Sequence, residues 1–140
     1  MTTGHEVAMA LRAAYLALHR QTNDCFSDAG VTADQFVVLA ALAEGDALTQ
    51  QDLVSRTFSD PNTLRAMLVL LERRRLIERR PHPTDGRQVN IELTAKGVAV
   101  RKSAREAKRT WLAHAVAQLD EQDRETLFAA GEIIKRLVEE

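Results

Sequence analysis

The fold is decided by residues 60–97, which read DPNTLRAMLVLLERRRLIERRPHPTDGRQVNIELTAKG. The stretch opens with Asp60 and Pro61, a helix N-cap residue and a proline that suits the first helical position. Apolar residues then recur at helical spacing, and at residues 76–80 and 89–93 the pattern changes to that of two short strands. The loop between them holds an Asp-Gly pair, a hairpin signal. The stretch therefore predicts a capped helix followed by a β-hairpin.

Capping residues and helical spacing predict the helices on either side of this stretch. Thr32 with Gln35 and Thr49 with Asp52 have the spacing of capping boxes, in which each side chain bonds the other residue's backbone N–H. The further helices are predicted at residues 5–28, 33–44, 50–56 and 95–118, with a sixth helix after Asp120.

Helix ends and weak points are also predicted from single residues. Gly30 suits a left-handed cap after the first helix, and Gly45-Asp46 is expected to end the second. The dense apolar residues 36–39 predict that this second helix is buried on more than one side. Gly97, early in the fifth helix that Thr94 caps, is expected to weaken it because glycine is a poor helix former.

The chain of 140 residues has room for one domain. With 45% hydrophobic and 28% charged residues it has a globular composition, which excludes a disordered tail or a fibre. Its longest unbroken apolar run, residues 36–43, is too short to span a membrane, and no secretory signal is visible at the N-terminus. A single cysteine, Cys25, excludes an intrachain disulfide framework, so we expect a cytoplasmic protein.

Charge is unevenly distributed along the chain, although the net charge is only −1. Residues 1–50 hold two basic and six acidic residues, and residues 111–140 hold three and seven. Residues 51–110, in contrast, hold fourteen basic and seven acidic residues. Clustered lysine and arginine are typical of a polyanion binder, although the solvated faces of charged helices give the same pattern.

The helix that begins at Pro61 has two different faces. At 100° per residue, Leu64, Met67, Leu68 and Leu71 cluster on one side and predict the buried face. The opposite side and its flanks hold Asn62, Thr63, Arg65, Ala66, Val69 and Arg73. Asparagine and arginine pair with adenine and guanine edges, and small apolar side chains contact thymine methyl groups. The alternative is that the apolar residues contact another part of the protein and the arginines form a solvated helix end.

Helix, short helix, capped helix and hairpin follow one another in the order of a winged helix-turn-helix. The predicted fold is mainly α with a small two- or three-stranded β-wing. Five motifs accompany this order: Leu53-Val54, Leu71-Glu72-Arg73-Arg74, Leu76-Ile77-Glu78-Arg79, Asp85-Gly86-Arg87 and Leu93-Thr94-Ala95-Lys96-Gly97. With these motifs, residues 32–97 resemble the DNA-binding core of the MarR family of bacterial transcription regulators.

The resemblance implies that the whole chain, 1–140, is one MarR-like regulator. Because no nucleophile or acid–base pair has a recognisable catalytic spacing, we do not expect an enzyme. Residues 32–97 would form the winged helix-turn-helix lobe, and residues 5–28 and 98–140 the helical base of an obligate homodimer. Such a dimer would bind a pseudo-palindromic operator in double-stranded DNA, with half-sites about one helical turn apart, and is expected to act as a repressor. A membrane is not an expected partner.

The resemblance also implies roles for the polar residues of the lobe. The recognition helix that begins at Pro61 would read bases, and the short helix would contact the DNA backbone. Arg87 at the wing tip would enter the minor groove, while Asp85 orients Arg87 or braces the wing. The predicted DNA-binding residues are Thr49, Gln50, Arg56, Asn62, Thr63, Arg65, Ala66, Val69, Arg73, Arg74, Asp85 and Arg87.

Arg75 departs from the family pattern, which commonly has glycine at this position. The position favours a left-handed backbone, which costs arginine about 1 kcal/mol. Two explanations are open: the turn has a different shape here, or Arg75 offsets the cost by contacting a DNA phosphate.

Members of the family are often released from DNA by a small aromatic or anionic effector that binds between the dimer base and the lobe. The residues that would line this region are Tyr15, His19, Phe36, Trp111 and His114. Packing in the dimer core is the alternative for the aromatic residues among them.

The residues leave two other functions open. One is redox sensing through Cys25, although Asp24 and Asp28 nearby are expected to make its thiol less reactive. The other is a helical protein-interaction module that does not bind DNA. No catalytic residues, cofactor or metal are expected, because the sequence has no phosphate-binding glycine loop and no metal-ligand spacing.

Overall fold

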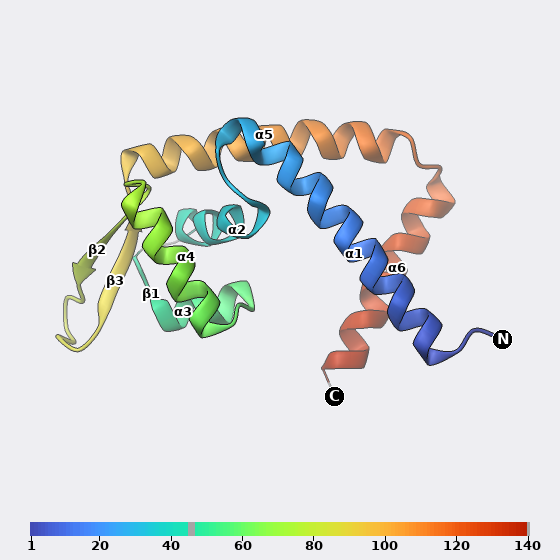
Figure 1. Ribbon diagram of the computed structural model, residues 1–140, viewed down its shortest axis with the longest axis horizontal. Helices are drawn as coiled ribbons and strands as arrows, with labels where there is room; N and C mark the ends of the chain where they lie inside the picture. Colours follow the sequence, from blue (N-terminus) through green and yellow to red (C-terminus); the bar gives the residue numbers. More distant parts are fainter. Residues whose placement is uncertain (45–46, 140) are drawn as a thin grey trace. The chain divides into compact units, whose positions relative to one another are not determined.

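The computed structural model describes residues 1–44 and 47–139, and the chain divides into two compact units, Met1–Ala107 and Lys108–Glu140. The helices are α1 (Gly4–Phe26), α2 (Ala33–Ala43), α3 (Gln50–Thr57), α4 (Pro61–Arg73), α5 (Ala95–Ala117) and α6 (Glu121–Val138) (Figure 1). The strands are β1 (Leu48–Thr49), β2 (Ile77–Pro81) and β3 (Val89–Leu93), and a 3-10 turn covers Ser27–Ala29. This architecture confirms the predicted mainly helical fold with a small sheet.

Side-chain caps begin the helices where the sequence predicts them. Thr32 Oγ1 accepts the N–H of Gln35, and Gln35 Oε1 accepts the N–H of Thr32, both at 3.1 Å. Thr49 and Asp52 form the same reciprocal pair at 3.2 and 3.0 Å, and Asp60 caps α4 ahead of its proline. These caps satisfy backbone donors that the first helical turn leaves unpaired.

Helix ends agree less closely with the sequence. The first helix, predicted to residue 28, ends at Phe26 and continues as the 3-10 turn. Gly30 has φ 76°, which confirms the left-handed cap. The second helix ends at Ala43, and its predicted terminator, Gly45-Asp46, lies outside the described residues.

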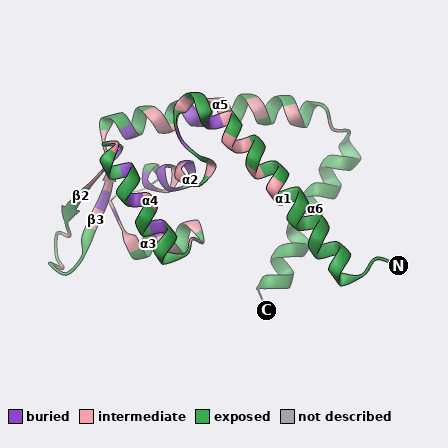
Figure 2. Cartoon of the chain, viewed as in Figure 1, coloured by how far each residue is buried: buried purple, intermediate pink, exposed green. Residues whose placement is uncertain are grey.

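The hydrophobic core lies in the first unit, where Figure 2 shows most of the purple, buried residues on α2, α4 and the sheet. Leu64, Leu68 and Leu71 have no exposed surface, which confirms the predicted inner face of α4. The helix α2 is buried on more than one side, as predicted, but Val37 is 45% exposed at its outer edge. The buried apolar residues are Phe26, Val31, Phe36, Val38, Leu39, Leu42, Leu48, Leu53, Leu64, Leu68, Leu71, Leu76, Ile77, Ile91 and Ala104.

The sheet has the strand order β1-β3-β2, and both pairings are antiparallel. Strand β1 was not predicted, because two residues are too short to show the alternation of a strand. It pairs Leu48 with Ile91 and Thr49 with Asn90. This pairing fixes the start of α3 beside the hairpin, which the chain order alone does not specify.

The connection from α4 through β2 to α5 is held at Thr94 and Gly97. Thr94 donates its N–H to the Leu76 carbonyl at 3.0 Å and its hydroxyl to the Arg75 carbonyl at 2.6 Å. Its Oγ1 also accepts the N–H of Gly97 at 3.0 Å, which confirms Thr94 as a cap. A Cβ at Gly97 would lie 2.0 Å from the Leu76 carbonyl oxygen. The low helix propensity expected of Gly97 stays a prediction, but the structure gives this glycine a packing role, because the missing side chain permits the close approach to Leu76.

The second unit contains the end of α5 and all of α6. The Asp120 Oδ1 atom accepts the N–H of Asp123 at 2.7 Å, which confirms the predicted start of α6. None of the described residues of α6 is buried, and its large apolar side chains include Phe128 at 74% and Leu137 at 72% exposure.

Among the described residues, no single helix has both the length and the apolar character needed to cross a membrane. The segments Gly4–Ala29 and Ala33–Ala43 reach that length and composition only when taken together across a 68° bend.

Candidate nucleic-acid interface

The outer face of α4 is exposed along its whole length. Asp60 Oδ2 accepts the N–H groups of Asn62 and Thr63 at 3.1 Å each, so the cap fixes the backbone from which this face begins. The Asn62 Oδ1 atom accepts a hydrogen bond from Arg65 Nη1 at 3.3 Å. Every predicted outer residue of this helix is exposed: Asn62, Thr63, Arg65, Ala66, Val69 and Arg73. The face thus offers an amide and a guanidinium, held together, ahead of two small apolar residues.

The start of α3 lies beside the hairpin because β1 pairs with β3. Thr49 is both the last residue of β1 and the N-cap of α3. The hydrogen bonds from its backbone and then from its side chain lower the pKa of Asp52, so that carboxylate stays ionised. Gln50 is half-buried at the first turn, and Arg56 is exposed in the last turn.

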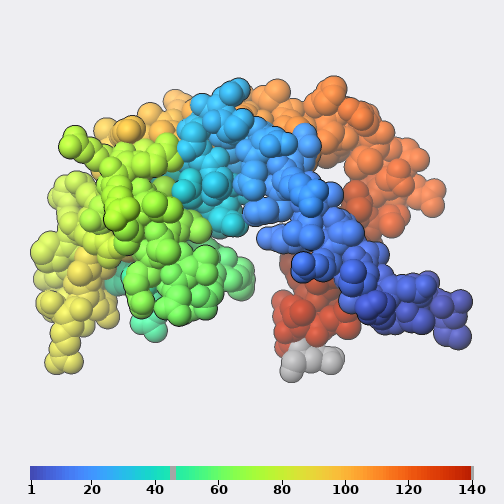
Figure 3. Space-filling model, viewed as in Figure 1, coloured from blue at the N-terminus to red at the C-terminus, as the bar shows by residue number. Residues whose placement is uncertain are grey.

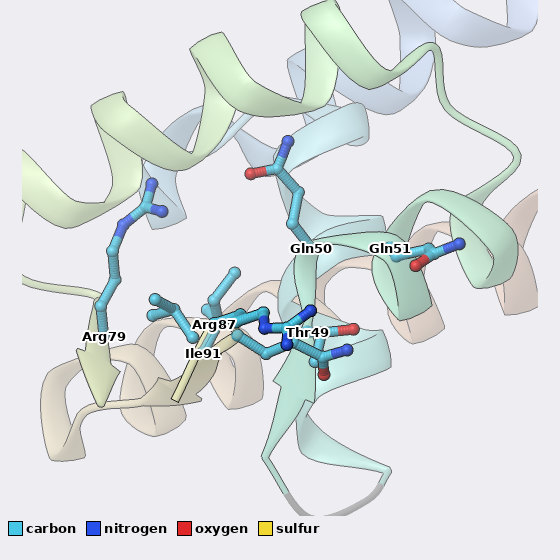
Figure 4. Close-up of a pocket in the computed structure, with 8 residues that line it drawn as sticks. Thr49, Gln50, Gln51, Arg79, Arg87 and Ile91 are labelled. Carbon is cyan, nitrogen blue, oxygen red and sulfur yellow. The ribbon is translucent and has the colours of Figure 1, made fainter. Parts of the chain in front are cut away.

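An open pocket of about 290 Å³ lies between the start of α3 and the hairpin. Figure 4 shows Arg79 extending from β2 on one side, with Gln50 and Gln51 on α3 on the other. The lining residues are Thr49, Gln50, Gln51, Arg79, Arg87, Gln88, Val89 and Ile91. Two guanidinium groups among amides and a hydroxyl make this pocket suited to an anion such as a phosphate.

The wing projects from the first unit as the yellow loop in Figure 3, and Arg87 is exposed in it. Asp85 Oδ1 accepts the backbone N–H of Arg87 at 3.0 Å, so Asp85 braces the backbone of the wing. Gly86 does not have the left-handed backbone of an Asp-Gly hairpin turn. The hairpin forms as predicted, but side-chain hydrogen bonds shape its loop.

The arginines after α4 have different surroundings. Arg73 is exposed, whereas Arg74 donates a hydrogen bond to the Gly30 carbonyl and so ties the end of α4 to the turn after α1. The Arg74 guanidinium is therefore already engaged by a contact within the protein. Arg79 pairs with Glu72 at 2.6 Å, which anchors its side chain beside the pocket.

Arg75 has φ 60°, so the left-handed turn expected at this position is present. A turn of different shape is therefore excluded as the explanation for arginine there.

The sequence placed Arg79 on the basic side of the hairpin but did not name it, Gln51 or Gln88 as DNA-binding residues, although all three line the pocket. The run of hairpin arginines was visible in the sequence. The sequence did not show that these residues lie close to α3, because that arrangement depends on the unpredicted strand β1.

The predicted effector-binding residues fall in different surroundings. Tyr15 stacks on His19 with ring centroids 5.6 Å apart, and His19 lies 3.9 Å from Asp34. Phe36 is 7% exposed and stacks on Phe26, so it is a core residue of the first unit.

Two further predicted effector residues, Trp111 and His114, belong to the second unit. His114 Nε2, in the last turn of α5, lies 3.0 Å from Nε2 of Gln118, the residue that follows the helix. Cys25, the predicted alternative redox site, is half-buried at the end of α1. Among residues 1–44 and 47–139, no three His, Cys, Asp or Glu side chains gather as metal ligands would.

Comparison with known proteins adds independent information. A model of the MarR family matches residues 29–88. The chain is similar to a helix-turn-helix-type transcriptional regulator of Mycobacterium bovis, with 31% identity over 134 residues, 96% of this chain and 94% of that one. It is also similar to the structure of the Mycobacterium tuberculosis transcriptional regulator MOSR in complex with DNA, with 25% identity, a TM-score of 0.74 and coverage of 94% and 97% of the two chains.

A second solved structure belongs to BpsR of Bordetella bronchiseptica, described for the regulation of its DNA binding by 6-hydroxynicotinic acid. It has 26% identity to this chain and a TM-score of 0.83, and the match covers 96% of both chains.

Proposed function

Because the chain belongs to the MarR family of transcription regulators, we propose that it binds a pseudo-palindromic operator as a homodimer and represses transcription there. One observation carries the proposal: the exposed polar face of α4, the start of α3 and the wing arginine all belong to one compact unit. The pocket between α3 and the hairpin, in the same unit, is lined by the guanidinium groups of Arg79 and Arg87.

Base reading is assigned to the outer face of α4. Asn62, Thr63 and Arg65 lie at the start of the helix, and a well-formed bidentate contact to a base discriminates by about 1–3 kcal/mol. Ala66 and Val69 follow on the same face and suit thymine methyl groups.

Contacts to the DNA backbone are assigned to residues around α3 and the end of α4. The proposed contacts are Thr49, Gln50, Arg56, Arg73 and Arg74, to which the pocket adds Arg79. Arg74 would have to exchange its bond with Gly30 for a phosphate, so we expect the smallest contribution from it. Arg87 would enter the minor groove from a backbone that Asp85 braces.

The homodimer is proposed from the apolar surfaces of α1 and α6. Tyr15 and Leu18 on α1 are 61% and 54% exposed, and Phe128 and Leu137 on α6 are more exposed still. Large apolar side chains at this density are typical of a surface that another chain covers. Two lobes held by such a base would meet successive major grooves of one DNA face.

Release by a small aromatic or anionic effector is part of the proposal. The stacked pair Tyr15 and His19 supports it, because a half-buried imidazole beside an aromatic ring suits an aromatic anion. A bound effector would favour dimers whose lobes are spaced wrongly for the operator.

The test is a fluorescence-anisotropy titration on a duplex taken from directly upstream of the gene, with a shuffled duplex as reference. We expect preferential binding that weakens as salt rises, because each neutralised phosphate releases about 0.9 counterion. Arg87→Ala should lose at least about tenfold in affinity while the dimer persists. Arg105→Ala removes the same charge from an exposed position on α5 and serves as the control. Equal losses for both variants would contradict the wing assignment.

A further inference from the structure

A histidine ring nitrogen organises the loop at the tip of the wing. The Nδ1 atom of His82 accepts the backbone N–H of Asp85 at 3.0 Å and that of Thr84 at 3.2 Å. A backbone N–H only donates, so Nδ1 carries no proton in this arrangement and the neutral ring holds its proton on Nε2. The shape of the loop therefore depends on a neutral imidazole.

Asp85, whose N–H donates to the His82 ring, accepts hydrogen bonds from two residues later in the loop, Arg87 and Gln88. Its Oδ1 accepts the N–H of Arg87 at 3.0 Å, and its carbonyl accepts the N–H of Gln88 at 3.1 Å. The N–H of His82 donates to the Gln88 carbonyl at 3.2 Å and closes the hairpin. A continuous set of hydrogen bonds thus links the His82 ring to the backbone of Arg87.

The charged groups that interact with His82 include Asp52 on α3 and Asp85 in the loop itself, and Arg56 on α3 in turn interacts with Asp52. Hydrogen bonds from Thr49 lower the pKa of Asp52, and the charges of Arg56 and His82 act in the same direction. Asp52 is therefore the charged group on α3 whose electrostatic interaction reaches the His82 ring. A protonated ring would also lose Nδ1 as an acceptor for the two loop N–H groups.

We propose that His82 is a positioning residue for Arg87, and that protonation of its ring releases the wing loop and weakens DNA binding as the pH falls. The inference rests on the proposed function of the wing. Histidine is the side chain whose charge ordinarily changes between about pH 5 and pH 8, so the test covers that range. The direction of the change in DNA affinity is diagnostic. An added positive charge on a DNA-binding surface by itself strengthens binding to the polyanion, whereas the proposal predicts weaker binding.

The first arm of the test uses the full chain without DNA. Backbone amide NMR spectra are recorded from about pH 8 to about pH 5.5, across the histidine titration range. The N–H signals of Thr84, Asp85 and Arg87 should shift with the titration of the His82 ring. In His82→Asn they should stay in place, because the Asn oxygen accepts the same N–H groups and does not titrate. Loop signals that ignore the ring titration in the wild type would overturn the proposal.

The second arm measures affinity for the upstream duplex at the two ends of that pH range. Relative to His82→Asn, the wild type should lose about tenfold on acidification, as expected for two lost hydrogen bonds. His82→Ala should bind weakly at both pH values. The other histidines are the same in wild type and His82→Asn, so they cancel in the comparison. Identical pH profiles for wild type and His82→Asn would refute the switch.

A double-mutant cycle separates this inference from the proposed function. If His82 acts through Arg87, then His82→Ala should cost nothing further in an Arg87→Ala background. Additive losses would show that His82 acts elsewhere and would overturn the positioning role. If Arg87→Ala binds as tightly as the wild type, the proposed function of the wing fails, while the NMR titration still decides whether His82 controls the loop.

Discussion

The helix-turn-helix part of the first unit and the helices α1 and α6 use apolar residues in opposite ways. In the former, Leu53, Leu64 and Leu68 have no exposed surface. In the latter, apolar residues such as Tyr15 and Phe128 are mostly exposed. The difference teaches that the DNA-binding lobe closes its core within one chain, whereas α1 and α6 leave large apolar side chains exposed, the surface on which the proposed homodimer depends.

The largest effect on stability is expected from removing a buried side chain from the core of the lobe. Leu64→Ala should destabilise the protein by about 3–4 kcal/mol, because it leaves a cavity in a fully packed site. Leu70→Ala on the same helix should cost much less, because Leu70 is 49% exposed. Urea unfolding followed by circular dichroism measures both. Equal losses would contradict the distinction between the inner and outer faces of α4.

The junction between the lobe and α5 should be nearly as sensitive. Gly97→Ala would drive a methyl group against the Leu76 carbonyl and should cost about 2–3 kcal/mol by overpacking. Gly131→Ala in α6 is the matched control, because a Cβ there meets nothing within 4 Å. It should be neutral or stabilising by up to about 1 kcal/mol, since alanine favours helix more than glycine does. A Gly97→Ala protein with wild-type stability would rule out the close packing at this junction.

A substitution on the exposed apolar surface of α6 should affect dimerisation but not the folding of the lobe. Phe128→Ala should raise the dimer dissociation constant by at least about tenfold and leave the unfolding of the lobe unchanged. Sedimentation equilibrium measures the constant. Phe58→Ala serves as control, since Phe58 is an aromatic residue of the lobe that is even more exposed, at 94% against 74% for Phe128. If only Phe58→Ala weakened the dimer, the interface would lie on the lobe and the assignment to α6 would be wrong.

The smallest effect concerns two left-handed residues, Arg75 at φ 60° and Gly30 at φ 76°. Arg75→Gly should stabilise the folded chain by about 1 kcal/mol, because it removes the backbone strain. Gly30→Ala should destabilise it by a similar amount for the same reason. Thermal unfolding measures both. Weaker DNA binding by the more stable Arg75→Gly protein would identify Arg75 as a phosphate contact.

Local signals in the sequence predicted local structure well. The caps at Thr32, Thr49 and Asp60 were predictable because each depends on residues within one helical turn. The left-handed position of Arg75 followed from the family pattern.

Signals that depend on tertiary contacts were missed. The packing role of Gly97 was not predicted, because it depends on a contact with Leu76, more than twenty positions earlier in the chain. The place of Arg79 and Gln51 in the pocket depends on the pairing of β1 with β3, for which two residues give no sequence signal. The assignment of the site residues to bases and phosphates remains a prediction.

The most direct measurement of the central claim is the stoichiometry of the DNA complex. Native mass spectrometry would compare a duplex carrying an inverted repeat from the upstream region with one in which a single half-site is scrambled. The account predicts two chains on the intact duplex and an affinity at least about a hundredfold lower on the scrambled one, because one recognition helix loses its base contacts. One chain per duplex, bound equally to both, would contradict it.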